Sequence, residues 1–296
     1  MVHAGSESTS ETRVHKQSCA QFCTWEGSAD GNEIDRSPGV ALPEAIHVGV
    51  VIPVHNEEQR LLPALESVGR AIDSCVEGRC SKAIAVVLDR CTDRSSHIAS
   101  DWRHRVLRAN RDRHIEIIEI DAGNVGSARR EGCRALLHRW TDDPMERIWL
   151  ATTDADSQVP ANWLSEQLHV RREGGQVWIG AVSVRNWSDR TPGTAEAWLR
   201  QYEDEALPIH GANFGIDAAT YLEAGGFEDL PTGEDRNLFE KAVALGASIR
   251  HDPSVRVVTS SRREARAPRG FAHALTVVEA AVSNHSMANP AEVAVS

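Results

Sequence analysis

The sequence predicts an α/β fold with a mainly parallel central sheet flanked by helices. The first observation is that short apolar runs alternate with segments of helical period between residues 47 and 184. The second is that polar or acidic side chains directly follow the first four of these runs. Strands separated by helices of about 10 to 15 residues are typical of βαβ units, whose right-handed crossovers place the loops after the strands along one edge of the sheet. We therefore expect a ligand site at that edge.

The first part of the pattern contains three strands. The runs at 47–54 (HVGVVIPV) and 82–88 (KAIAVVL) are predominantly apolar, as buried strands are. The run at 114–120 (HIEIIEI) alternates instead, so one of its faces is expected to be wetter. Helices are expected at 58–72, from about Ser95, and at 126–140.

The second part of the pattern continues to the end of the predicted domain. Strands are expected at 147–153 and 177–184, with a helix at 162–173 between them. Gly211–Ile216 is a segment of small residues that lets the backbone approach a ligand closely. A further helix is expected from Glu234 and a late strand at 255–259, followed by a loop at 260–270.

The chain is expected to contain one domain between two unstructured ends. Residues 1–45 are rich in Ser, Gly, Glu and His and have no apolar period, so we expect a disordered leader. A single domain is expected at 46–282 and a flexible tail at 283–296. Of the 296 residues, 41% are hydrophobic, which allows a core of useful size.

Charge and hydropathy exclude several classes of partner. The formal net charge of -11 argues against general binding to nucleic acid or to an anionic membrane, since both need a basic surface. No apolar run approaches the roughly 18 residues that a transmembrane helix needs, and the N-terminus lacks the apolar core of a signal peptide. A cytoplasmic protein is the expectation.

Asp154 and Asp156 follow the predicted strand at 147–153 and are separated by one small residue. Two carboxylates on a tight turn suit Mg²⁺ or Mn²⁺, which proteins usually hold through one or two carboxylates while substrate phosphates supply further ligands. The alternative is a turn or cap aspartate before the next helix. Asp89 ends the second strand, where it is suited either to binding a nucleobase or to forming a turn.

Four segments in order resemble the nucleotide-binding half of a family 2 glycosyltransferase with the GT-A fold. They are Val50–Glu58 (VVIPVHNEE), Asp89–Ser95 (DRCTDRS), Gly123–Arg129 (GNVGSAR) and Thr153–Ser157 (TDADS). The resemblance covers roughly residues 47 to 275. It implies a Rossmann-like nucleotide half followed by an acceptor half.

The resemblance also implies roles for the nucleotide half. Glu57, the first acidic residue after the segment that begins at Pro53, would contact the nucleoside, and Asp89 would hold the base. Asp154 would lie near the ribose, Asp156 would bind the metal, and Arg129 would approach the nucleotide. For Arg129 the alternative is a solvent-facing position on a helix.

In the acceptor half, Asp235 matches the catalytic base of the family and would accept the proton of the acceptor hydroxyl. For Asp235 and its neighbour Glu234 the alternative is helix capping. Gly211 and Asn213 are candidates for a backbone approach to the acceptor or the phosphates. Arg262 and Arg263, with Arg266 and Arg269, suit a flap over the diphosphate, or else form a solvated charge cluster.

The sequence departs from its relatives at the third metal ligand. Many relatives have a histidine after the late strand, where this chain has Thr259–Ser261, so His251 or His273 would have to substitute. The membrane-spanning extensions of processive members are absent from the sequence, so polymer synthesis is not expected.

The predicted function is metal-dependent transfer of a sugar from a UDP- or GDP-sugar to a small or lipid-like hydroxyl acceptor, with inversion. A nucleotidyltransferase is the first alternative, but it would normally have a glycine-rich phosphate loop with a basic residue after the first strand. A non-catalytic nucleotide-sugar binding protein is the second, but it would be expected to lack Asp156 or Asp235.

Overall fold

The computed structural model describes residues 46–75, 81–204, 207–230, 232–264 and 270–288. The predicted leader at 1–45 and the last eight residues of the predicted tail lie outside the described residues. Among the helices that the model describes, none is both long enough and apolar enough to cross a membrane.

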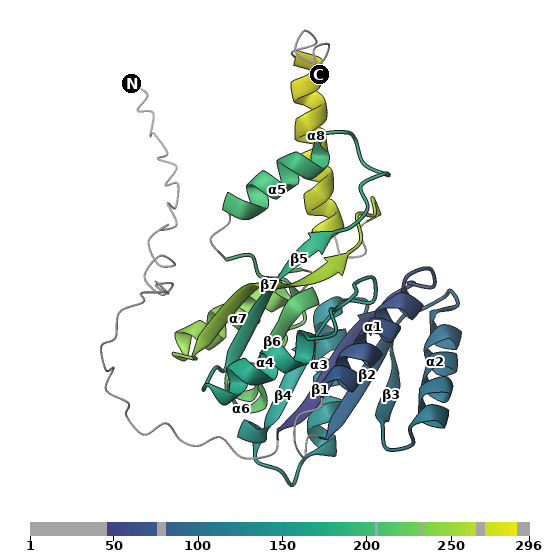
Figure 1. Cartoon of the computed structure of the whole chain (residues 1–296), viewed down its shortest axis with the longest axis vertical. Helices are drawn as coiled ribbons and strands as arrows, with labels where there is room; N and C mark the ends of the chain where they lie inside the picture. The colour runs from purple at the N-terminus through teal and green to yellow at the C-terminus, as the bar shows by residue number, and fades with distance from the viewer. Residues whose placement is uncertain (1–45, 76–80, 205–206, 231, 265–269, 289–296) are drawn as a thin grey trace, which may run out of the picture. The chain divides into compact units, whose positions relative to one another are not determined.

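The centre of the fold is a seven-stranded sheet in the order β3-β2-β1-β4-β6-β5-β7 (Figure 1). Pairs β1–β2, β2–β3, β1–β4 and β5–β7 are parallel, whereas β6 runs antiparallel to both β4 and β5. The predicted α/β fold with a mainly parallel sheet is confirmed. The strands are β1 (His47–Val54), β2 (Lys82–Asp89), β3 (His114–Ile120), β4 (Ile148–Thr152), β5 (Val177–Val184), β6 (Phe214–Asp217) and β7 (Ile249–Thr259).

The helices alternate with the first strands as the sequence pattern predicts. They are α1 (Leu61–Ser74), α2 (Ser95–Ala109), α3 (Val125–Arg139), α4 (Trp163–Arg172), α5 (Thr194–Asp204), α6 (Ala218–Glu223), α7 (Glu234–Ala244) and α8 (Phe271–Ala288), with short 3₁₀ helices at Met145–Arg147 and Gly211–Asn213. One boundary needs correction. Helix α8 runs through Ala288, six residues past the predicted end of the domain at 282.

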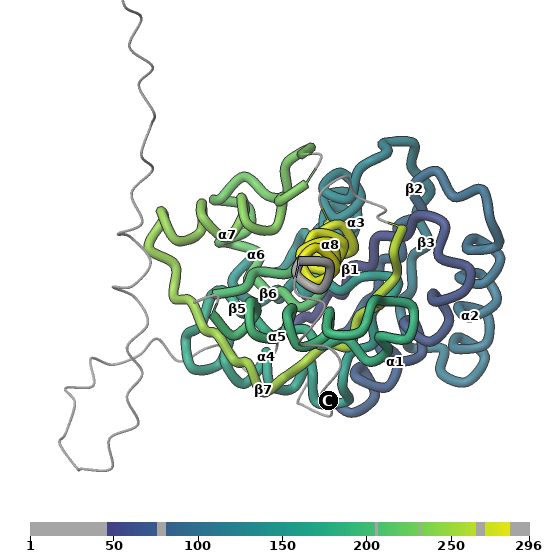
Figure 2. The backbone as a smooth tube through the Cα atoms, turned by 90° about the horizontal axis from the view of Figure 1, so that it is seen from above, coloured from purple at the N-terminus to yellow at the C-terminus, as the bar shows by residue number. Residues whose placement is uncertain are grey.

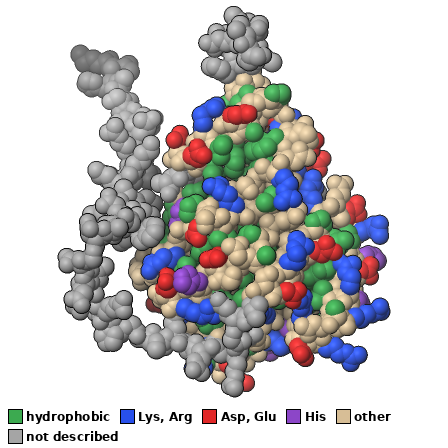
Figure 3. Space-filling view, in the orientation of Figure 1, with side chains coloured by type: hydrophobic (Ala, Val, Ile, Leu, Met, Phe, Trp, Pro, Cys, Tyr) green, Lys and Arg blue, Asp and Glu red, His purple; other side chains and the backbone are tan. Residues whose placement is uncertain are grey.

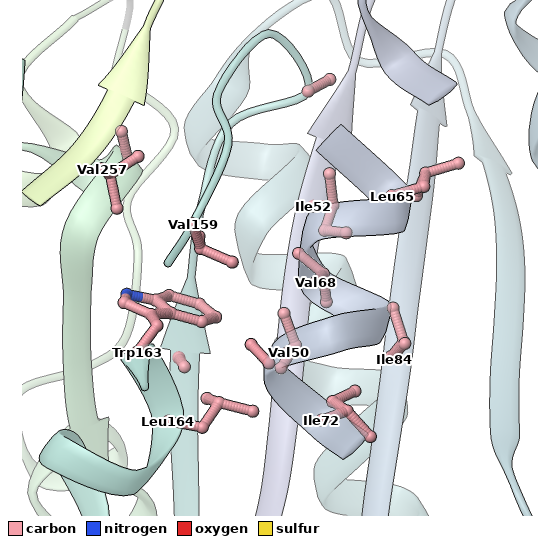
Figure 4. Close-up of a cluster of buried hydrophobic side chains, with 14 of the residues drawn as sticks. Val50, Ile52, Leu65, Val68, Ile72, Ile84, Val159, Trp163, Leu164 and Val257 are labelled. Atoms are coloured by element: carbon pink, nitrogen blue, oxygen red, sulfur yellow. The ribbon is translucent and has the colours of Figure 1, made fainter. Parts of the chain in front are cut away.

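Two buried clusters cover the two faces of the sheet. On one face, Val50 and Ile52 of β1 pack with Leu65 and Val68 of α1 and with Trp163 of α4 (Figure 4). The cluster on the other face takes its helical side chains from α3, α6 and α7. Strand β3 lies at the edge of the sheet and buries only Ile115 fully among its residues, which agrees with the expected wetter face.

Helices α5 and α8 pack on each other beyond the carboxyl ends of β5 and β7 (Figure 1). Figure 2 views α8 nearly end-on, above the sheet. An aromatic group joins the pair: Trp198 of α5 stacks on Tyr202 at 4.8 Å between ring centroids and meets Phe271 of α8 edge-on at 5.9 Å. The first turn of α8 is thereby held next to the strand ends, where ligands bind in open α/β sheets.

Candidate active site

A cavity of about 510 Å³ opens at the carboxyl ends of the parallel strands. Its walls are the loops after β1 to β4, the segment before β6, the start of α7, the end of β7 and the start of α8. Two of the predicted site residues, Asn213 and Arg263, do not line it. Those that do are Pro53, Glu57, Asp89, Arg129, Asp154, Asp156, Gly211, Glu234, Asp235 and Arg262.

The Asp154–Asp156 turn brings two carboxylates to the cavity because Ala155 between them is buried in the core. The turn is closed by the Ser157 N–H, which donates to the Asp154 carbonyl at 3.1 Å. Burial raises the pKa of Asp156 to about 6, and the charges of Asp154 and Glu57 add to this although Arg262 opposes it. Asp156 is therefore a carboxylate whose charged form is disfavoured mainly by its burial.

Arg129 bridges the two halves of the cavity. Its side chain is 4% exposed, so the solvent-facing alternative is wrong. One Nη donates to Asp154 Oδ1 at 2.6 Å and the other pairs with Glu234. Burial disfavours the charged guanidinium, but the charges of Asp154 and Glu234 raise the pKa of Arg129 above its ordinary value. The arginine on α3 thus links the turn after β4 to the first residue of α7.

Asp235 lies in the first turn of α7 and is half-buried at the cavity wall. Its Oδ2 accepts the Gly211 N–H at 2.6 Å, and its Oδ1 accepts the Arg236 N–H at 2.8 Å. The N-cap of the helix is Gly233, with φ of 77° and no side-chain capping bond. The carboxylate of Asp235 is therefore oriented toward the segment before β6 and does not occupy the cap position.

Gly211 is the point where that segment touches the arginine bridge. Its carbonyl accepts from the Thr152 hydroxyl at 2.6 Å and its N–H is held by Asp235. A Cβ at this position would overlap the guanidinium of Arg129. Only glycine lets the backbone pass so close to the arginine.

Asp89 has a structural role as well as a place in the cavity wall. Its Oδ1 accepts the N–H groups of Ala122 and Gly123, each at 2.9 Å. These bonds tie the end of β2 to the loop after β3. Among the described residues, Oδ2 has no hydrogen-bond partner, and the residue lines the cavity. Both alternatives for Asp89, turn formation and an open carboxylate oxygen at the site, are compatible with this geometry.

Arg262 and Arg263 diverge. Arg262 reaches into the cavity, where one Nη pairs with Glu57 and the other lies 3.3 Å from Asp156 Oδ2. Arg263 turns away and contacts Glu279 of α8 at 2.6 Å and the Asp189 carbonyl at 2.6 Å. The alternative of a solvated charge cluster is thus wrong for Arg262. Arg266 and Arg269 lie outside the described residues.

Asn213 belongs to the core, which corrects its assignment to the acceptor or phosphate segment. The side chain is fully buried, and its Oδ1 accepts the indole N–H of Trp163 at 2.9 Å and of Trp178 at 3.4 Å. Its Nδ2 donates to the carbonyls of Ala181 and Val255, both at 2.9 Å. With its amide engaged on both ends, Asn213 holds β5, β6, β7 and α4 together and does not face a ligand.

The family model described as Glycosyl transferase family 2 matches residues 49–221, more than half of the chain. The chain belongs to glycosyltransferase family 2. No curated protein matches its sequence.

The glycosyltransferase is similar in fold to solved structures of this family. Residues 1–349 of TarS from S. aureus, in complex with UDP-GlcNAc, match with a TM-score of 0.54 and 14% identity, over 80% of this chain and 66% of that one. The mannosyltransferase PcManGT from Pyrobaculum calidifontis, in complex with GDP-Man and Mn²⁺, matches with a TM-score of 0.52 and 19% identity, over 79% of this chain and 60% of that one. This chain therefore spans about two thirds or less of their lengths.

The cavity of this glycosyltransferase suits a divalent cation. Six carboxylates and three guanidiniums of the described residues line it, so an anionic diphosphate would need added positive charge there. No group of three His, Cys, Asp or Glu side chains among the described residues is placed to hold a metal, and His251 and His273 lie outside the cavity wall. Asp156, with Asp154 beside it, would thus supply one or two ligands, as is usual for Mg²⁺ completed by phosphates.

Sequence reasoning missed one mainly apolar part of the cavity wall. It consists of Val182, Ile209 and His210 together with Phe271, Ala272 and Ala274 of α8. His210 meets Phe271 edge-on, with 5.9 Å between ring centroids. No local motif marks these residues. The available signal was the apolar content of 271–288, which predicts a helix without saying where it packs.

Proposed function

We propose that the enzyme transfers a sugar from a UDP- or GDP-sugar to a hydroxyl acceptor, with inversion and with Mg²⁺ or Mn²⁺ as cofactor. The observation that carries the proposal is that the Asp154–Asp156 turn and Asp235 line one cavity. Arg129 connects them through Asp154 and Glu234. A donor-binding group and a proton acceptor on one cavity are what direct transfer to a hydroxyl requires.

On the donor side, the geometry supports the roles implied by the family. Glu57 and Pro53 lie after β1 and would contact the nucleoside, and the open oxygen of Asp89 would accept an N–H of the base. Asp154 would lie near the ribose, with Arg129 holding its carboxylate. That TarS was solved with UDP-GlcNAc and PcManGT with GDP-Man supports a nucleoside-diphosphate sugar as donor.

Asp156 would hold the cation, with Asp154 as the second carboxylate. A bound divalent cation neutralises the diphosphate and makes it a better leaving group. The burial of Asp156 near the carboxylates of Asp154 and Glu57 supports this role, because a buried carboxylate near two others is stabilised by an added positive charge. The Mn²⁺ complex of PcManGT supports the choice of metal.

Asp235 would act as the base. The acceptor oxygen attacks the anomeric carbon, the new C–O bond forms, and the bond from that carbon to the diphosphate oxygen breaks with its electron pair. The acceptor proton passes to Asp235, whose carboxylate is held by the Gly211 N–H. One displacement inverts the anomeric centre. The wall of Ile209, His210 and Phe271 beside Asp235 would receive the body of a small or lipid-like acceptor.

A thermal-shift panel of UDP-, GDP-, ADP- and TDP-sugars and of the nucleoside triphosphates, with and without Mn²⁺, tests the proposal. A donor at about 100 times its Kd stabilises the fold by about 2.7 kcal/mol. For a domain of this size that is a rise in Tm of roughly 5 to 10 °C. We expect a UDP- or GDP-sugar to give this rise only with Mn²⁺. A panel in which no nucleotide sugar raises the Tm would contradict the proposal, and a rise with nucleoside triphosphates alone would favour a nucleotidyltransferase.

A further inference from the structure

Arg190 is a buried arginine that no motif of the sequence singles out. It lies in the loop between β5 and α5, and its side chain is 0% exposed. Its Nε donates to the Ser261 carbonyl at 2.8 Å. One Nη donates to Thr276 and Glu279 of α8, both at 3.0 Å. The other donates to the carbonyls of Arg262 and, at 3.4 Å, Ala272. Five acceptors match the five N–H groups of a guanidinium.

Glu279 completes the arrangement from α8. Its Oε2 accepts from Arg190, while its Oε1 accepts the N–H of Thr191 at 2.6 Å, the hydroxyl of Thr191 at 2.8 Å and an Nη of Arg263 at 2.6 Å. Arg190 therefore fastens the backbone of Ser261 and Arg262 to α8, and Glu279 holds Arg190 in place. A buried arginine with all its donors engaged is rigid, because losing one bond would leave a buried polar group unsatisfied.

The loop fixed in this way aims Arg262 into the cavity. Its guanidinium lies between Glu57 and Asp156, 3.3 Å from the Asp156 Oδ2. In the proposed function Glu57 contacts the nucleoside and Asp156 the cation. The diphosphate of a donor connects these two points, so it has to pass the Arg262 guanidinium, which is suited to phosphate oxygens by its fork geometry.

We infer that Arg190 and Glu279 are positioning residues for donor binding: by holding the backbone of Ser261 and Arg262, they place the Arg262 guanidinium on the diphosphate. The inference rests on the proposed function, which supplies the diphosphate. It assigns to α8 a part in donor recognition, in addition to its part in the wall near Asp235.

A double-mutant cycle with Arg262→Ala and Arg190→Lys tests the inference. The probes are UDP and GDP in the presence of Mn²⁺, and the corresponding nucleosides, all measured by isothermal titration calorimetry on the full chain. Arg262→Ala removes a charged hydrogen-bond donor, so we expect the Kd of the nucleoside diphosphate to rise roughly 10- to 100-fold. Arg190→Lys should raise it about three- to tenfold, because one ammonium cannot make the five bonds.

The decisive result is the behaviour of the double variant. If Arg190 acts through Arg262, Arg190→Lys should change the Kd less than about twofold when Arg262 is already alanine. Nucleoside affinity should fall much less than that of the nucleoside diphosphate in all variants, since Arg262 reaches the nucleoside only through Glu57. Arg105→Lys, in the exposed pair with Glu66, is the matched control and should bind as wild type does. Glu279→Gln, which keeps shape and an acceptor oxygen, is the second variant if Arg190→Lys does not fold.

Two results would overturn the inference alone. The first is an additive cycle, or an equal loss for nucleoside and nucleoside diphosphate, since either means that the pair only supports the fold. The second is an unchanged or tighter Kd in Arg262→Ala, because Arg262 would then be merely the counter-ion of Glu57 and Asp156. A wild type that binds neither UDP nor GDP would instead refute the proposed function, and the inference with it.

Discussion

Arg129, Asp235 and Gly211 show how single residues connect the two halves of the cavity. Arg129 pairs with Asp154 on one side and Glu234 on the other, and Gly211 lies against its guanidinium while donating to Asp235. A disturbance at any of them is transmitted to the others through direct contact. Chemistry and fold are therefore expected to respond together at this point of the structure.

Asp235→Asn should separate binding from chemistry. The amide cannot accept the acceptor proton, so turnover should fall by about 10² to 10⁴, the usual contribution of positioned proton transfer. Donor affinity should stay within a few-fold, because the base touches the acceptor. Turnover at saturating donor and acceptor and donor titration are the two measurements. Equal turnover in the variant and the wild type would show that Asp235 is not the base.

Gly211→Ala should damage activity through Arg129. The added Cβ overlaps the guanidinium, and such overpacking costs about 1 to 3 kcal/mol. We expect a Tm several degrees lower and at least tenfold lower kcat/KM. Gly69→Ala on α1 is the control, since its Cβ would stand 3.6 Å from Trp102. The close approach is not required if Gly211→Ala matches that control in both Tm and kcat/KM.

The sequence predicts the identity of the cavity residues better than their environments. Strand ends and short motifs placed Asp89, Asp154 and Asp156 at one edge of the sheet, because parallel strands end together. Asn213 and Arg190 could not be interpreted in the same way. Their roles depend on partners between 32 and 89 positions away along the chain, which only the folded structure brings together.

At the scale of elements, apolar period predicted the strands at 47–54, 114–120 and 177–184 with both ends correct. The direction of β6 could not be predicted, because a short strand has the same local pattern whether it runs parallel or antiparallel. Helix α8 was not predicted and extends past the expected domain end at 282. Its position depends on aromatic contacts with Trp198 of α5 and with His210, which its own sequence does not contain.

Comparison of the wild type with Glu279→Gln should show how the stabilising contribution of the Glu279 carboxylate on α8 changes as pH falls. Burial alone would raise the pKa of Glu279, but hydrogen bonds from Thr191 and Arg190 and the charge of Arg263 lower it to about 2. A carboxyl group whose pKa is lower in the folded state than in the unfolded state stabilises the fold above its unfolded pKa. This stabilisation is lost as pH falls through the folded pKa.

The window for this effect therefore lies between about pH 4.5 and pH 2. Within it, we expect the wild type to lose on the order of 1 to 2 kcal/mol of unfolding free energy more than Glu279→Gln does. Denaturant unfolding at several pH values measures the difference. Parallel pH profiles for the two proteins would mean that the hydrogen bonds of Glu279 contribute no pH-dependent stability.

At the scale of the whole molecule, the charged side chains on the surface are arranged differently from the arginines in and near the cavity. Figure 3 shows acidic and basic side chains interspersed over one face of the protein. In and near the cavity, the buried or mostly buried arginines Arg129, Arg190 and Arg262 are each paired with a carboxylate.

Deletion of residues 1–45 should leave the stability of the domain nearly unchanged. Those residues have no apolar period with which to add to the core, and β1 starts at His47. We expect the Tm of the shortened protein to lie within about 2 °C of the full chain. A fall of more than about 5 °C, roughly 1 to 2 kcal/mol for a domain of this size, would mean that the segment packs on the core.

The most direct test of the account is the Mn²⁺ dependence of nucleotide binding in the wild type and in Asp156→Asn. The amide keeps the shape of the side chain but lacks the charge that holds a divalent cation. We expect calorimetric titration to show that Mn²⁺ tightens binding of UDP or GDP at least tenfold in the wild type. Mn²⁺ should leave the weaker nucleotide binding of Asp156→Asn unchanged, and the Tm of this variant should equal that of the wild type. Asp156→Asn with the same Mn²⁺ dependence as the wild type would contradict the account.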